Sequence, residues 1–273
     1  MRADIHNHTC HFSPDAKMTP DELINAAIAN GIDVAGITEH YEYDNPDPED
    51  TVQTFDIDEY NLRFEEWKRS CPPPLKLLKG IEFGYQSHIV PVIDRIAKSN
   101  DFDIVILSNH LFRGRDVYFL GDHYKDTSKI ERHNEYINVM AEMCEKCSGY
   151  DVAAHFDYIN RYNTDKEEYL LYDDCPKAFD RFFEALISKN KCLEINTRSV
   201  YKAYMKGSSI IMPDRKIIER YLAMGGELIS LGSDSHTPDT LGIYFDDMYE
   251  YLRAIGVTEL CYFEKRQPVT FGI

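Results

Sequence analysis

The sequence predicts an α/β protein, a closed barrel of about seven strand–helix units. Short apolar runs of strand type alternate with stretches of helical spacing about seven times along the 273 residues. The strand-like runs are apolar throughout, which is typical of parallel strands that are buried on both faces. No glycine-rich phosphate loop follows the first run, so a barrel is favoured over an open nucleotide-binding sheet.

The predicted strands are short and recur along the whole chain. Each is a run of apolar residues that ends where polar residues begin. Their expected ranges are 3–5, 34–38, 75–83, 104–107, 152–154, 192–195 and 228–231. One last short strand is expected at 259–263.

The predicted helices lie between these strands. The first has the clearest boundaries, because Thr19 can cap it, Pro20 suits its first turn and Gly31 ends it. In the second, apolar residues recur at helical spacing from Ile57 to Trp67. The expected ranges are 19–30, 57–69, 88–98, 128–147, 177–188, 213–224 and 241–254.

The composition limits the expected partners and compartment. A net charge of −17 disfavours nucleic acid and anionic membranes, and no apolar run reaches the length of a membrane span. The first residues lead into a strand without an apolar leader, so we expect no signal peptide. Seven cysteines, an odd number, are typical of reduced thiols in a cytoplasmic protein. No linker divides the chain, so residues 1–273 are expected to form one domain.

Polar side chains, most of them of metal-ligand type, follow every predicted strand. His6 and His8 end the first strand, and residues i and i+2 of a strand point to the same side. The other members of this set are Asp15, Glu39, His40, Glu82, His110, His155, Glu194, Asn196, Arg198, Asp234 and His236. Any one of them alone would be more typical of a structural or solvated side chain. Their recurrence in every unit indicates a site at the barrel mouth, where the carboxyl ends of the strands converge.

The chemistry of this set favours transition metals. Many imidazoles with a few carboxylates suit zinc, iron(II) or manganese, whereas calcium prefers oxygen ligands. About nine ligands are too many for one ion, so two or three divalent ions that share a bridging carboxylate are predicted. Of the remaining histidines, His88, His123 and His133 are expected to be solvated or capping, and His11 lies within reach of the first loop.

Six motifs carry a resemblance to a known family. They are His6-x-His8, Thr38-Glu39-His40, Gly80-Ile81-Glu82, Ser108-Asn109-His110, His155 and Ser233-Asp234-Ser235-His236. With these motifs the chain resembles the polymerase-and-histidinol-phosphatase (PHP) superfamily, and most closely its monofunctional histidinol-phosphatases. The resemblance runs from residue 4 to residue 236. It implies a distorted (β/α)7 barrel, similar to the TIM barrel, with a trinuclear metal centre.

The resemblance also implies a role for each residue of the site. The ligand sets for the three ions would be His6, His8, Glu82 and Asp234; Glu82, His110 and His155; and Asp15, His40 and His236. In the first loop, His11 is the alternative to Asp15. Arg161 and Arg198 match positions that hold the substrate phosphate in histidinol-phosphatases.

The implied activity is hydrolysis of L-histidinol phosphate to L-histidinol and phosphate, a step of histidine biosynthesis. A hydroxide that bridges two ions would attack phosphorus, and Asp234 or His236 would assist the leaving alcohol. The imidazole and ammonium of the substrate would need carboxylates and an aromatic wall. The aromatic candidates near the strand ends are Tyr41, Tyr43, Phe83 and Tyr85.

Other functions fit parts of the same pattern. A PHP-type phosphatase could act on a different phosphomonoester, such as phosphotyrosine. A metal-binding accessory module without turnover is a further alternative, although its expected loss of ligands is not seen. The acidity of the chain argues against a DNA-editing nuclease. A zinc amidohydrolase is disfavoured, since it usually carries a carboxylated lysine where Glu82 stands here.

Overall fold

Seven parallel strands form the central sheet in a computed structural model that describes residues 1–120, 126–162, 169–205 and 212–273. The strands follow one another in the sheet in the order in which they occur in the sequence. They are β1 (Ala3–Asp4), β2 (Val34–Tyr41), β3 (Lys76–Gly84), β4 (Ile104–Ser108), β7 (Val152–Ala153), β8 (Cys192–Asn196) and β9 (Ile229–Gly232). All seven were predicted, and every pair of neighbours is parallel.

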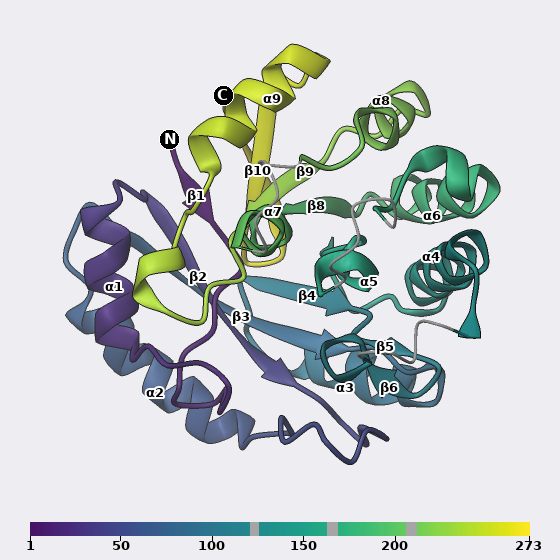
Figure 1. Ribbon diagram of the computed structural model, residues 1–273. Helices are drawn as coiled ribbons and strands as arrows, with labels where there is room; N and C mark the ends of the chain where they lie inside the picture. Colours follow the sequence, from purple (N-terminus) through teal and green to yellow (C-terminus); the bar gives the residue numbers. More distant parts are fainter. Residues whose placement is uncertain (121–125, 163–168, 206–211) are drawn as a thin grey trace.

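The sheet curves until its first and last strands meet. The amide of Ile5 lies 3.5 Å from the carbonyl oxygen of Leu231, and Asn7 forms an isolated parallel bridge with Ser235. The result is a nearly closed barrel, with its helices on the outside (Figure 1). The predicted seven-stranded α/β barrel is therefore confirmed.

The outer helices follow the predicted ranges closely. They are α1 (Pro20–Ala29), α2 (Ile57–Ser70), α3 (Val90–Ser99), α4 (Lys129–Lys146), α6 (Pro176–Ser188), α8 (Arg215–Ala223) and α9 (Phe245–Ile255). Helix α1 begins with a capping box, in which Thr19 and Glu22 each bind the other's backbone amide. The last helix starts four residues later than predicted because Gly242 and Tyr244 have positive φ angles, which a helix cannot contain.

Three short elements that the sequence analysis did not predict follow strands at the carboxyl end of the barrel. They are the β5–β6 hairpin (Leu111–Phe112 and Arg115–Asp116), α5 (Tyr158–Arg161) and α7 (Thr197–Met205). The first two are too short for a periodic pattern to show. Helix α7 begins directly after β8, so no loop marks its start. Four 3₁₀ turns complete the described elements, at Ser87–Ile89, Val117–Phe119, Tyr172–Asp174 and Pro238–Thr240.

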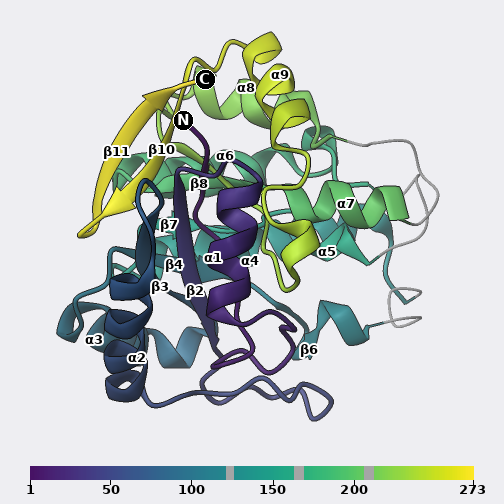
Figure 2. The same cartoon turned by 90° about the vertical axis from the view of Figure 1, so that its left-hand side faces the viewer.

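The opposite end of the barrel is covered by an antiparallel hairpin of β10 (Glu259–Glu264) and β11 (Gln267–Gly272). Figure 2 shows it on the far side of the molecule from α5 and α7. Arg266, in its turn, donates to the carbonyl oxygens of Ala97 and Gly149 and pairs with Asp151. The strand predicted at 259–263 is thus present, but it pairs outside the barrel.

Two of the remaining histidines can be compared with expectation. His88 is exposed and lies 2.7 Å from Asp44 Oδ2, as a solvated residue would. His133 is fully buried, which contradicts the prediction, because Asp174 and Asn160 supply polar partners 3.0 Å from its two ring nitrogens. His123 lies outside the described residues.

Within the described residues, no helix combines the length and the apolar character needed to cross a lipid bilayer.

Asp4 joins the first strand to the last. Its buried carboxylate accepts hydrogen bonds from the backbone and hydroxyl of Ser233 and from the amide of Gly242. We expect Asp4→Ala to lower the free energy of unfolding by about 2–3 kcal/mol, since two buried amides lose their acceptor. Urea denaturation followed by the fluorescence of Trp67 would measure it. The control is Asp33→Ala, because Asp33 is exposed and accepts a hydrogen bond from one backbone amide, that of Arg2. An equal loss of stability in both variants would contradict the proposed role of Asp4 in joining the first and last strands.

Candidate metal centre

The predicted ligands converge at the carboxyl end of the barrel. His6 and His8, which follow β1, bring their ring centroids to 5.1 Å from each other. Each of the other six strands adds at least one polar side chain to the same place, since parallel strands end at one mouth. Eight of the nine predicted ligands are buried. These eight are His6, His8, His40, Glu82, His110, His155, Asp234 and His236.

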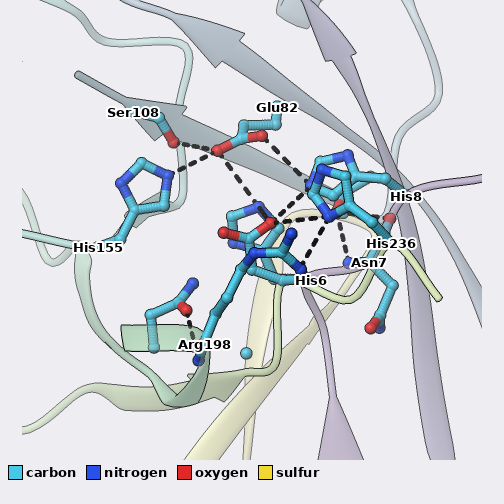
Figure 3. Close-up of polar contacts among 12 residues, drawn as sticks. His6, Asn7, His8, Glu82, Ser108, His155, Arg198 and His236 are labelled. Carbon is cyan, nitrogen blue, oxygen red and sulfur yellow. Dashed lines mark hydrogen bonds and ion pairs between the residues drawn. The ribbon is translucent and has the colours of Figure 1, made fainter. Parts of the chain in front are cut away.

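Glu82 lies at the middle of the cluster and is completely buried (Figure 3). Its Oε1 atom is 3.2 Å from Nε2 of His6, 3.3 Å from Nε2 of His110 and 3.0 Å from Nε2 of His155. The hydroxyl of Ser108 also donates to this oxygen. One carboxylate oxygen therefore faces three imidazoles from three different strands.

The second oxygen of Glu82 faces the other half of the cluster. Oε2 lies 2.7 Å from Nδ1 of His40 and 3.5 Å from Nε2 of His8. The ring of His8 stacks on His40, and its Nε2 atom is 3.2 Å from Oδ1 of Asp234. Glu82 thus has the position expected of a bridging carboxylate.

Asp15 completes the far side of the cluster, on the first loop. Its Oδ2 atom is 2.8 Å from Nε2 of His236 and 3.7 Å from Nε2 of His40. His11, the alternative ligand, is exposed and its ring contacts the rings of Phe12 and Trp67 instead. The geometry therefore favours Asp15 over His11.

Glu39 holds the loop that follows β1, which carries Asp15, in place. This buried carboxylate accepts hydrogen bonds from the backbone and hydroxyl of Thr9 and from the hydroxyl of Ser13. Glu39 precedes His40 on β2, so its side chain points to the opposite face of the strand. It supports the loop that presents Asp15 and does not join the cluster itself.

Two acidic residues orient the ligand histidines. Oε1 of Glu194 lies 2.7 Å from Nδ1 of His6, and its Oε2 accepts the backbone amide of His155 at 2.9 Å. Oε1 of Glu42 lies 2.8 Å from Nδ1 of His110. Glu194 was among the residues predicted at the strand ends, without a role, and Glu42 was not predicted. The spacing of His40 and Glu42, two residues apart at the end of β2, is the signal that could have found it.

The electrostatics of the cluster favour bound cations. Burial raises the pKa of Glu82, but the surrounding imidazoles outweigh this and hold the pKa well below its usual range. Arg161 likewise lowers the pKa of Asp234, although burial raises it. His40 lowers the pKa of Asp15 in the same way, again against the effect of burial. Burial lowers the pKa of His40, yet Glu82 and Asp15 raise it to about 9. Ionised carboxylates that attract protons onto their neighbours would attract divalent ions in the same way.

Several buried ligand atoms lack a hydrogen bond among the described residues. They include Nε2 of His6, Nε2 of His8 and Oε2 of Glu82. Unsatisfied buried polar atoms are costly and rare in folded proteins, so a cluster of them that converges on one region needs a partner. Groups of three ligand atoms that could hold an ion occur at His6–His8–Glu82, Glu82–His110–His155 and His8–His40–His236. The donor set fits metal ions.

A cavity of about 330 Å³ opens onto this centre. Arg161 and Arg198 line it, as the phosphate prediction requires. Arg161 pairs with the carboxylate of Asp234, and Nη1 of Arg198 donates to the carbonyl oxygen of the same residue at 2.7 Å. Both guanidinium groups are therefore fixed beside the centre, and Figure 3 shows Arg198 there.

The aromatic wall of the cavity differs from the prediction. Tyr41, Tyr43, Phe83 and Tyr85 are not among its lining residues. The rings of Tyr41 and Phe83 pack on each other, and both residues are buried, because their positions on the strands point them toward the helices. The aromatic residues that do line it lie in the segments that follow β4 and β7 and are Tyr118, Phe119, Tyr158 and Tyr162.

The resemblance read from the motifs is supported by direct comparison. A sequence model of the PHP domain matches residues 4–198. The chain belongs to the PHP domain family. The match ends at Arg198, so Asp234 and His236, which complete the cluster, lie beyond it.

Similar proteins of the PHP family are histidinol-phosphatases by name. The chain is 32% identical over 272 residues to "Probable histidinol-phosphatase" of Clostridium acetobutylicum, covering 97% of this chain and 98% of that protein. It is 27% identical over 237 residues to the histidinol-phosphatase of Lactococcus lactis, and the match covers 86% of this chain and 84% of that protein. The crystal structure of histidinol phosphate phosphatase from L. lactis, complexed with zinc, L-histidinol and phosphate, matches with a TM-score of 0.84 and 25% identity over 98% of both chains.

Glu194 offers a test of how this PHP centre positions its ligands. We expect Glu194→Gln to weaken metal binding about 10- to 100-fold, because His6 loses the anionic partner that fixes its ring. Metal titration of the metal-free protein, with activity and bound metal both measured, would show the loss, and excess metal should restore most of the activity. Glu145→Gln, at an exposed pair with Arg181, is the matched control. Unchanged metal affinity in Glu194→Gln would remove the residue from this role.

Proposed function

We propose that the protein is a metal-dependent phosphomonoesterase that hydrolyses L-histidinol phosphate to L-histidinol and phosphate. The observation that carries this proposal is the placement of two arginines beside a cluster of nine ligand-type side chains at one cavity. The family match and the names of the full-length relatives support the same activity. The related L. lactis structure, which holds zinc, L-histidinol and phosphate, supports it further.

The proposed centre takes two or three divalent ions, with zinc, iron or manganese as candidates. The sets of residues proposed to hold them are His6, His8, Glu82 and Asp234; Glu82, His110 and His155; and Asp15, His40 and His236. In support of this, Glu82 is within 3.5 Å of five imidazoles, and Asp15 is within 3.7 Å of both histidines of its set. When bound, such ions supply positive charge to phosphoryl oxygens and lower the pKa of water towards neutrality.

The residues of the chain itself would orient the ester. Arg161 and Arg198 present planar, permanently charged donors that suit the oxygens of a phosphoryl group. Arg161 is almost fully buried, so its interaction with a phosphoryl group would be little screened by solvent. Bound in this way, the phosphorus would face the ligand cluster.

Asp234 and His236 were predicted to assist the leaving alcohol. Nδ1 of His236 lies 2.9 Å from the carbonyl oxygen of Asp234, and a carbonyl can only accept. This contact places a proton on Nδ1 and leaves Nε2 with a lone pair in the neutral ring. The arrangement favours a ligand role for His236, and the assignment of the leaving-group proton to either residue stays a prediction.

The substrate proposal is tested by the specificity of the metal-loaded enzyme. Phosphate release would be measured for L-histidinol phosphate, phosphotyrosine and p-nitrophenyl phosphate, with and without a chelator. We expect a kcat/KM at least about a hundredfold higher for L-histidinol phosphate, and its loss on chelation. A flat profile would favour a phosphatase for another ester, and no turnover despite bound metal would favour the accessory module.

We also propose that residues 1–273 form one domain and that the protein is cytoplasmic. The ligands from β1 to β9 belong to one cluster, so a division of the chain would separate parts of the site. All seven cysteines are free thiols, and five of them are buried, which suits a reducing compartment.

A further inference from the structure

The cavity beside the metal centre has ends of opposite charge. Arg161 and Arg198 form the cationic end, whereas Glu42, Asp50 and Asp116 line the same cavity with carboxylates. Two of these carboxylates are used locally. Glu42 binds His110, and the oxygens of Asp50 accept from Val52 N and Asn45 Nδ2, at 2.8 and 2.6 Å.

Asp116 differs from the other two carboxylates. Its Oδ1 atom accepts the amide of Tyr118 at 2.7 Å and the hydroxyl of Tyr158 at 3.1 Å. No hydrogen bond reaches Oδ2 from the described part of the chain, and Asp116 has no ion-pair partner there, although the residue is only 7% exposed. A buried anion without a countercharge is unfavourable, so the remaining oxygen of Asp116 is suited to a cationic ligand.

The backbone holds Asp116 rigidly next to the centre. Its amide donates to Oδ2 of Asp47 at 2.7 Å, and the amide of Val117 donates to the carbonyl oxygen of His110 at 3.0 Å. Burial raises the pKa of Asp116 to about 6, so the side chain is still mostly ionised above pH 7. The position is therefore fixed by the same strand end that supplies a proposed metal ligand.

Tyr158 links the two ends of the cavity. The guanidinium of Arg161 lies over its ring, 4.8 Å from the centroid, and its hydroxyl binds Asp116. The ring also contacts His110 and His155, with centroids 5.3 and 5.0 Å away. Arg161 and Asp116 thus contact the same tyrosine side chain, one at its ring and the other at its hydroxyl. An ester that carries a cation a few bonds from its phosphate fits this arrangement.

We propose that Asp116 accepts a hydrogen bond from the ammonium group of the substrate, an inference that rests on the proposed function. Asp116 is then a specificity-determining residue that selects phosphomonoesters of amino alcohols. The structure gives this role to Asp116 because both oxygens of Asp50 already accept hydrogen bonds and Glu42 is already paired with the imidazole of His110. Esters without a nearby cation leave the carboxylate unpaired and are disfavoured.

The test compares the wild type with Asp116→Asn on three esters. They are L-histidinol phosphate, its analogue without the amino group, and p-nitrophenyl phosphate. For L-histidinol phosphate we expect kcat/KM to fall about 30- to 100-fold, mostly through a higher KM, because a hydrogen bond between charged partners is lost. For the two esters without an ammonium group we expect changes below about threefold, and metal content should be unchanged.

The outcomes separate this proposal from the proposed function. A wild type that does not prefer L-histidinol phosphate would contradict the function before the variant is considered. Given that preference, an equal loss on the ester without the amino group would show that Asp116 does not meet the ammonium and would overturn the inference. A loss on p-nitrophenyl phosphate as well would indicate a structural role and would also overturn it. Asp103→Asn, which removes an aspartate charge at the other end of the barrel, is the matched control.

Discussion

Glutamine in place of Glu82 is expected to lower kcat/KM for L-histidinol phosphate by about 10⁴-fold, together with the amount of bound metal. The two oxygens of Glu82 lie within 3.5 Å of five imidazoles contributed by four strand ends, and the side chain is completely buried. An amide keeps the shape but removes the negative charge and one acceptor oxygen. Loss of one member of a catalytic unit commonly costs this much. Phosphate release and metal analysis by mass spectrometry would measure both effects.

The control for this variant is Glu264→Gln. Glu264 pairs with Lys76 at the opposite end of the barrel, at a site that is partly exposed. We expect that variant to keep wild-type activity and metal content. If Glu82→Gln retained its full metal content and most of its activity, Glu82 would not be a bridging ligand. The proposed assignment of ligands to the individual ions would then be wrong. Circular dichroism would show whether a loss comes from unfolding instead.

Much of the fold could be predicted because its elements have local signals. Each strand of the barrel contains or borders a short apolar run, and α1 is bounded by Thr19 and Gly31, whose preferences are local. The elements that were missed lack such signals. The β5–β6 hairpin has two residues in each strand, and its position depends on contacts such as the amide of Asp116 with Asp47, which is far away in the sequence. No local pattern encodes a contact of this kind.

The candidate site was predictable for a topological reason. In a parallel barrel every strand ends at the same mouth, so ligand-type residues after each strand must converge. The convergence of His8 and Glu82 follows from this rule together with the alternation of side chains, whereas the bridging role of Glu82 came from the resemblance to the PHP superfamily and stays a prediction. The residues that orient the proposed ligands were harder to identify. Nothing in the sequence around Glu42 and Glu194 indicates that they bind the Nδ1 atoms of His110 and His6.

The substrate cavity was the least predictable part. Its aromatic lining comes from the segments after β4 and β7, whereas Tyr41 and Phe83, near the strand ends, are core residues. Burial of Tyr41 and Phe83 follows from the parity of their strands, which a shift of one residue in register would reverse. The residues that line the cavity therefore needed the folded chain, whereas the convergence of the proposed metal ligands could be expected from the sequence.

Alanine in place of Arg198 is expected to lower kcat/KM for L-histidinol phosphate by about 10²- to 10³-fold, with metal content unchanged. A guanidinium that binds a phosphoryl oxygen pair makes two charge-assisted hydrogen bonds, each of about 1.5–2 kcal/mol, and 1.4 kcal/mol corresponds to a factor of ten. Because the charge on the phosphoryl oxygens is redistributed in the transition state, kcat should fall as well as KM rise. Steady-state kinetics together with metal analysis would show this combination.

Arg198 also contacts the protein, and the experiment must separate the two roles. Its Nη1 atom donates to the carbonyl oxygen of Asp234, so its removal could disturb a proposed metal ligand. A purely structural role would reduce the bound metal and would affect kcat with every ester alike, whereas a phosphate-binding role leaves the metal in place and weakens inhibition by inorganic phosphate. Arg220→Ala, which removes an arginine from an exposed pair with Asp180 on α8, is the matched control and should keep wild-type kinetics. Unchanged kinetics and phosphate inhibition in Arg198→Ala would remove the residue from the site and leave Arg161 as the one guanidinium proposed to hold the ester.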